Sequence, residues 1–197
     1  QIVVFLGRMA GALVEKVGRV AVPAVNVEPT EQPGSGGFLR ALPLHPAVWK
    51  TVATIGSGFA VYAVSPPRDL WWLVPVALVP FFLVVRGQRA RVGFGYGLIF
   101  GLAFLLPLVG WPWPWLGVGL VEALFFGLAG AGIARVSRLP AAPVWAAAVY
   151  LAAELARSSV PFGGFPWGRL AFTQSEGVLL PLASVGGAAL VTFAVAL

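Results

Sequence analysis

Long apolar blocks alternate with short polar breaks from about residue 48 to the end of the chain. Blocks of this kind favour membrane-spanning helices over the core of a soluble domain, because each is long enough, or nearly so, to cross the hydrocarbon layer. The pattern therefore predicts an all-α fold, a polytopic transmembrane helical bundle of about six spans. We expect the spans at about residues 48–64, 73–85, 92–109, 116–133, 142–155 and from 178 onward.

Residues 1–47 follow a different pattern and are predicted to be a separate polar or amphipathic extension with a linker. The stretch 2–22 mixes apolar and charged residues, which is typical of an amphipathic helix at a membrane surface. A weak targeting segment explains this stretch equally well. Residues 28–37 are polar and rich in Pro and Gly, as in linkers. The transmembrane domain is accordingly expected over residues 48–197.

Charge supports the membrane interpretation. Only 10% of the 197 residues are charged, against about 25% in soluble domains. The net charge of +6 comes largely from arginines in the breaks at 86–91 and 135–138. Arginines confined to short loops are typical of the cytoplasmic side of a multi-pass protein and disfavour nucleic-acid binding. We therefore expect a protein of the cell membrane with its arginine-rich loops in the cytoplasm.

The inventory of reactive side chains is small. The chain has no cysteine and one histidine, so we expect no disulfide, no thiolate chemistry, no metal site and no cofactor. It begins at Gln1 and ends inside an apolar run, from which we expect a fragment of a longer protein.

Two features within the spans predict tertiary contacts. Gly93, Gly97 and Gly101 recur every four residues, which lets a second helix approach closely. Glu122 and Glu154 are carboxylates in apolar runs, where such groups are either functional or paired. Glu154 stands three positions before Arg157, a spacing that favours an ion pair on one helix.

The segment 157–177 is the most informative stretch. Its glycines and prolines oppose regular helix, and its aromatic and polar residues suit a re-entrant or interfacial loop on the outer face. From the residues alone, such a loop could simply anchor the bundle. The candidate substrate-binding residues are Arg157, Phe165, Pro166, Trp167, Arg169, Gln174 and Glu176.

This segment carries a resemblance to a known family. The run Gly-Phe-Pro-Trp at 164–167, followed by Phe172, Gln174, Glu176 and Gly177, resembles the apolipoprotein N-acyltransferase family, most closely its actinobacterial members. The resemblance covers roughly residues 50–197 and identifies them with the N-terminal membrane domain.

The resemblance implies a function for the whole protein. Family members transfer an acyl chain from a phospholipid to the N-terminal cysteine of diacylated lipoproteins. Their catalytic Glu, Lys and Cys lie in a nitrilase-like domain, before which this chain would be truncated. No catalytic residue is therefore expected in this fragment, which would hold the two lipid substrates among the lipids of the membrane. By this interpretation Arg157 and Arg169 meet a phospholipid phosphate.

Two alternatives remain. Some actinobacterial relatives are associated with polyprenol-phosphate mannose synthase, so the resemblance leaves open a non-catalytic membrane anchor or scaffold for that mannosyltransferase. A transporter is disfavoured, because the chain shows no repeated halves and only Glu122 as an ionisable group in the middle of a span.

Overall fold

The computed structural model describes residues 46–68, 70–109, 114–160 and 163–197. Within these ranges all regular structure is helical, and the predicted all-α fold class is confirmed. The α-helices are α2 (Pro46–Val64), α3 (Val74–Val85), α4 (Ala90–Val109), α5 (Pro114–Val136), α6 (Ala142–Arg157) and α7 (Ala183–Ala196). Short 3₁₀ helices are η1 (Trp71–Leu73), η2 (Leu170–Gln174) and η3 (Leu180–Leu182). Residues 1–45 of the predicted extension lie outside the described residues.

Three helices among the described residues have the length and composition of membrane spans. Pro46–Val64, Ala90–Val109 and Leu116–Val136 are long and apolar enough to cross a bilayer, and Trp71–Val85 and Leu180–Ala196 are shorter apolar helices. Large apolar side chains of α2, such as Trp49, Val52 and Phe59, are exposed. Lipid is the solvent in which such side chains are stable. The bundle is therefore a polytopic membrane protein, as predicted.

Most helix ends lie within three residues of their predicted positions, and the last span is the exception. We expected it from about residue 178, but α7 begins at Ala183. Residues 180–182 form η3, which contains Pro181. Gly186 and Gly187 then break the helical backbone within α7 itself. Proline and glycine together explain the late start and the kink.

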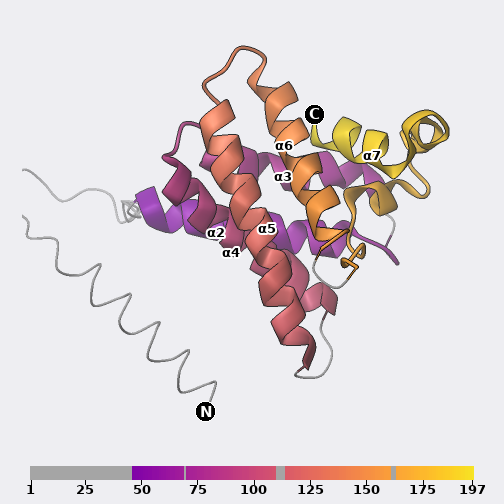
Figure 1. The fold of residues 1–197 in the computed structure, drawn as a ribbon, viewed down its shortest axis with the longest axis horizontal. Coiled ribbons are helices and arrows are strands. Elements are labelled where there is room, and N and C mark those ends of the chain that lie inside the picture. Colours follow the sequence, from indigo (N-terminus) through magenta and orange to yellow (C-terminus); the bar gives the residue numbers. More distant parts are fainter. Residues whose placement is uncertain (1–45, 69, 110–113, 161–162) are drawn as a thin grey trace, which may run out of the picture. The chain divides into compact units, whose positions relative to one another are not determined.

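The most extensive helix–helix contact joins α4 to α5 (Figure 1). Gly93 lies against the backbone of Gly130, and Gly97 lies against the backbone of Phe126. A side chain at either glycine would collide with the facing helix, so the prediction that this glycine face packs closely is confirmed.

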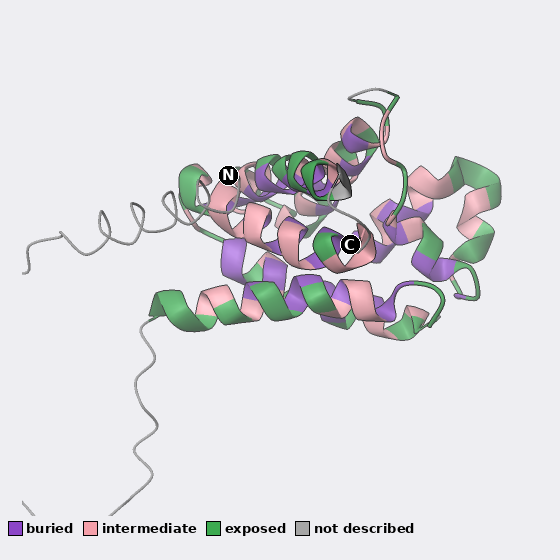
Figure 2. Ribbon diagram, turned by 90° about the horizontal axis from the view of Figure 1, so that it is seen from below, coloured by how far each residue is buried: buried purple, intermediate pink, exposed green. Residues whose placement is uncertain are grey.

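Aromatic rings fill the space beside this glycine contact. Phe81 of α3 stacks on Phe100 of α4 with ring centroids 4.3 Å apart. Phe126 of α5 meets Phe100 edge-on at 5.5 Å. All three are buried, and the buried positions of the helices face their neighbours in Figure 2. Their packing fixes the positions of α3, α4 and α5 relative to one another.

The loops gather at two ends of the bundle. At one end the backbone N–H of Gly87 donates to Ser137 Oγ at 3.0 Å, and Arg138 donates to the Gly87 carbonyl at 3.4 Å. These contacts join the two arginine-rich loops. At the other end, Ser65 after α2 and Leu108 of α4 border one hollow together with residues 167–169. The bundle thus has a cationic end and an end built around the candidate loop.

Candidate functional site

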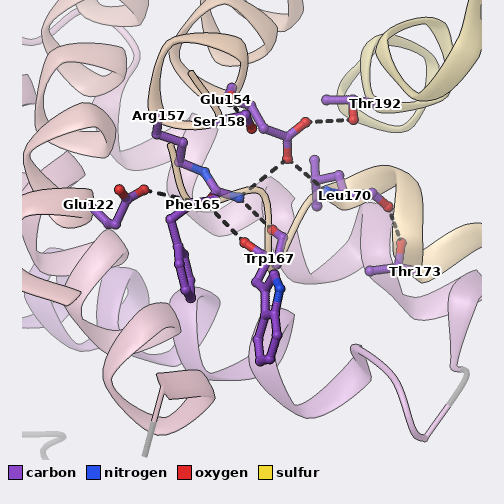
Figure 3. Close-up of polar contacts among 10 residues, drawn as sticks. Glu122, Glu154, Arg157, Ser158, Phe165, Trp167, Leu170, Thr173 and Thr192 are labelled. Carbon is purple, nitrogen blue, oxygen red and sulfur yellow. Dashed lines mark hydrogen bonds and ion pairs between the residues drawn. The ribbon is translucent and has the colours of Figure 1, made fainter. Parts of the chain in front are cut away.

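Arg157, the last residue of α6, lies at the centre of the candidate site and is completely buried. Its Nη1 donates to the carbonyls of Phe165 and Trp167, each at 2.9 Å, and its Nη2 donates to the carbonyl of Gly168 at 2.9 Å (Figure 3). The Phe165 N–H donates in return to the Arg157 carbonyl at 2.9 Å. One side chain therefore binds three carbonyls of the irregular loop.

Two buried carboxylates flank this guanidinium. Glu154 Oε1 lies 3.9 Å from Arg157 Nη2, which confirms the ion pair predicted from their spacing on α6. Glu122 Oε2 of α5 lies 3.6 Å from Arg157 Nη1. The guanidinium carbon also lies 5.5 Å from the centre of the Phe126 ring, a favourable cation–π distance. The cation is thus paired on both sides, as a buried charge requires.

Glu154 links three further parts of the chain to α6. Its Oε1 accepts the N–H of Leu170 at 2.8 Å, and its Oε2 accepts the hydroxyl of Thr192 at 2.6 Å. Leu170 begins η2 and Thr192 lies in α7. Figure 3 shows these contacts on the side of Glu154 away from Glu122. A single carboxylate therefore fixes both η2 and α7 against α6.

The 3₁₀ helix η2 is held at its other end as well. Gln174 donates from Nε2 to the carbonyl of Trp71 at 3.2 Å, and the Thr173 hydroxyl donates to the Leu170 carbonyl at 2.6 Å. Gln174 is 1% exposed, so its side chain supports η2 from within the bundle. The loop is accordingly connected to α6, α7 and η1.

The outward side of the loop has a different character. Trp167 is 68% exposed, and Phe172 is 46% exposed. Together with Arg169 they border a hollow of about 310 Å³, whose remaining lining residues are Ser65, Pro66, Leu108 and Gly168. The Nε of Arg169 is buried and has no hydrogen-bond partner. The hollow is therefore bordered by aromatic rings and by an arginine whose buried Nε has no hydrogen-bond partner within the described residues.

The structure divides the predicted site residues into two groups. Trp167 and Arg169 border the hollow. Phe165 lies beside Trp167 with ring centroids 5.8 Å apart, and Pro166 and Glu176 are exposed. Arg157 and Gln174 are buried beneath this surface. Neither Arg157 nor Gln174 borders the hollow.

Sequence reasoning did not connect Glu122 or Thr192 to this site. Thr192 is a single hydroxyl in an apolar run, 38 positions after Glu154, and no local spacing relates the two. The apolar run around Glu122 predicts a carboxylate that is functional or paired, and its partner in the structure is Arg157. Within the described ranges, no three His, Cys, Asp or Glu side chains gather in a way that could hold a metal ion.

Taken together, a helical bundle with apolar exposed flanks and a hollow bordered by aromatic rings and an arginine at one end defines an integral membrane domain. The comparisons with known proteins make this class specific. The family model described as "Apolipoprotein N-acyltransferase N-terminal domain" matches residues 57–197. This chain belongs to that family, as the resemblance predicted.

A curated relative shows how similar this chain is to a known protein and how much of that protein it covers. The apolipoprotein N-acyltransferase of Mycolicibacterium smegmatis is 44% identical in an alignment of 175 positions that covers 83% of this chain. The matched region is 28% of the relative's length, so the chain corresponds to less than a third of that protein.

Proposed function

We propose that this chain is the lipid-holding membrane domain of an enzyme that transfers an acyl chain from a phospholipid to the N-terminal cysteine of diacylated lipoproteins. The observation that carries the proposal is the hollow in which Arg169 lies with Trp167 and Phe172. Both substrates of such a reaction are amphiphiles, so they need a site open to the membrane with polar and apolar walls.

Each residue on the outward side of the loop has a distinct task in this proposal. Arg169 binds the phosphate of the acyl donor, because a guanidinium matches phosphate oxygens with paired donors. Phe165, Pro166 and Trp167 contact acyl chains at the edge of the hollow. Glu176, exposed beyond η2, offers a polar contact to the lipoprotein acceptor.

The acyl transfer itself belongs to another part of the full-length enzyme. By family resemblance, a Cys nucleophile attacks the phospholipid ester, forms a thioester and releases the lysophospholipid. The lipoprotein amine then attacks the thioester, forms the amide and frees the Cys thiol, with Glu as base and Lys stabilising the tetrahedral intermediate. Such covalent catalysis divides one difficult transfer into two easier steps. This chain has no cysteine and contributes substrate binding. The arginine-rich loops face the cytoplasm and the hollow faces outward.

The test is an acylation assay with the full-length protein in membranes. A diacylglyceryl-cysteine lipopeptide is the acceptor, and mass spectrometry follows the gain of one acyl chain. The proposal expects a gain that disappears when the nucleophilic cysteine is replaced. An intact, folded protein that produces no gain would contradict it and favour the scaffold for a polyprenol-phosphate mannosyltransferase.

A further inference from the structure

We infer that Arg157 is a positioning residue, which places Trp167 and Arg169 by holding the backbone between them. It acts with Glu122, Glu154 and Thr192, and these four residues are called the polar clamp below. That Arg157 places the loop follows from contacts in the structure alone. That Arg157 thereby affects acyl transfer rests on the proposed function.

The carbonyls of the loop need a hydrogen-bond donor from another element, because the N–H groups of the loop itself cannot reach them. Gly163, Gly164 and Gly168 have positive φ angles, which are incompatible with helical hydrogen bonding along this stretch. Carbonyl groups left unpaired inside a membrane protein are costly. Arg157 removes that cost by donating to three of them, from residues 165, 167 and 168.

A guanidinium fits this task better than an ammonium group would. Its donors lie in one plane and point in fixed directions, so two nitrogens reach three carbonyls at 2.9 Å without rearrangement. Glu122 and Glu154 approach this group at 3.6 and 3.9 Å. Thr192 then fixes Glu154 from α7. Thr192 therefore restricts the side chain of Glu154, and Glu154 and Glu122 restrict the guanidinium of Arg157.

Burial separates this role from direct lipid binding. Arg157 is 0% exposed and is absent from the lining of the hollow, whereas Arg169 borders it. Trp167 is 68% exposed, and no side-chain hydrogen bond fixes its indole among the described contacts. Figure 3 shows the indole pointing away from the Glu154–Thr192 contact. Arg157 therefore sets the position of Trp167 through its carbonyl, and also holds the carbonyl of Phe165, whose ring lies beside the indole.

The first test compares Arg157→Lys with Arg169→Lys in the 197-residue chain by hydrogen–deuterium exchange in lipid nanodiscs. Both substitutions keep the positive charge, and only the first removes the three-carbonyl contact. We expect Arg157→Lys to speed exchange of the amides of residues 163–174 about tenfold, while α4 and α5 keep their protection. Unchanged exchange in Arg157→Lys, or equal acceleration in Arg169→Lys, would overturn the polar clamp.

A second variant covers the case in which Arg157→Lys does not fold. Thr192→Val removes one hydrogen bond to Glu154 and leaves Arg157 in place. Faster exchange at Leu170 and its neighbours, with unchanged α4 and α5, supports the polar clamp. Protection equal to that of the parent chain would overturn it. Neither measurement requires acyltransferase activity, so a failure of the proposed function would be seen separately.

The effect on catalysis is read from the full-length enzyme. If Arg157 only stabilised the bundle, its replacement would reduce the amount of active enzyme and lower kcat with KM unchanged. A misplaced hollow instead raises KM for the phospholipid donor. We expect Arg157→Lys to raise KM severalfold with normal helical content. A fall in kcat alone would refute the positioning role.

Discussion

Trp167 combines an exposed indole with a firmly held carbonyl. The side chain is 68% exposed, while its carbonyl accepts a hydrogen bond from buried Arg157 at 2.9 Å. A residue of this kind contributes little to stability through its side chain. Its large apolar surface is available to a ligand instead, in keeping with the role proposed for it.

Replacing Trp167 by alanine should therefore separate binding from stability. We expect the free energy of unfolding to change by no more than about 0.5 kcal/mol, as for other exposed positions. Losing roughly 1.5 kcal/mol or more of apolar contact with substrate should raise KM for the lipid about tenfold. Thermal unfolding of the chain and acylation kinetics of the full-length enzyme measure the two effects. A large loss of stability with normal KM would show that the indole packs within the bundle.

Arg169→Ala tests the cation of the hollow. A charged hydrogen bond contributes about 1.5–3 kcal/mol, so KM for the phospholipid should rise about tenfold or more. Arg138→Ala is the matched control, because Arg138 lies in the cationic end of the bundle, at a loop joined to Gly87. Kinetics measured against phospholipid concentration distinguish the variants. Equal effects of the two substitutions would exclude a specific phosphate contact.

Among the elements, α4 and α5 depend most directly on small residues. The backbone of Phe126 occupies the space where a side chain at Gly97 would lie, whereas the space at Gly95 on the same helix is open. The two glycines are two positions apart in one helix. They therefore form a matched pair for testing the contact.

Gly97→Ala should destabilise the bundle by about 1–3 kcal/mol through overpacking. Gly95→Ala should leave stability unchanged or improve it by up to about 1 kcal/mol, because alanine favours helix more than glycine does. Unfolding in detergent micelles, followed by circular dichroism, gives both values. If the two variants unfolded alike, close packing at Gly97 would not be what holds α4 to α5.

The elements also show what local sequence patterns can and cannot predict. Apolar blocks predicted most helix ends to within a few residues, because hydrophobic length and prolines act locally. The spacing of Glu154 and Arg157 likewise predicted their ion pair. The contacts of Arg157 with Glu122 and of Glu154 with Thr192 join different helices, so they depend on tertiary packing. The pattern does not predict the 3₁₀ helix η2 for a similar reason. Its contacts reach other elements: Glu154 of α6 accepts the Leu170 N–H, and Gln174 donates to the Trp71 carbonyl.

At the scale of the whole molecule, the two ends of the bundle differ in charge and in shape. The arginine-rich loops meet at one end through Gly87 and Ser137. The hollow lies at the other end, next to the C-termini of α2 and α4. This separation makes the proposed orientation testable with single labels.

The absence of cysteine from the chain makes such labelling direct. Glu176→Cys places a thiol just after η2, in the segment that carries the candidate site, and Gln88→Cys places one in an arginine-rich loop. We expect a membrane-impermeant maleimide to label Glu176→Cys in intact cells and Gln88→Cys only after permeabilisation. The reverse pattern would invert the proposed topology.

The polar clamp also bears on how the chain is made. Translation proceeds from the N-terminus, so Arg157 enters the translocon before the three carbonyls it will bind, and Glu154 enters 38 residues before Thr192. Until α7 has been synthesised, Glu154 lacks one of its two hydrogen-bond donors. A nascent chain stopped before Thr192 would carry an incompletely paired carboxylate in lipid, a state that is costly. Completion of α7 thus supplies the last hydrogen-bond donor that Glu154 has in the folded bundle.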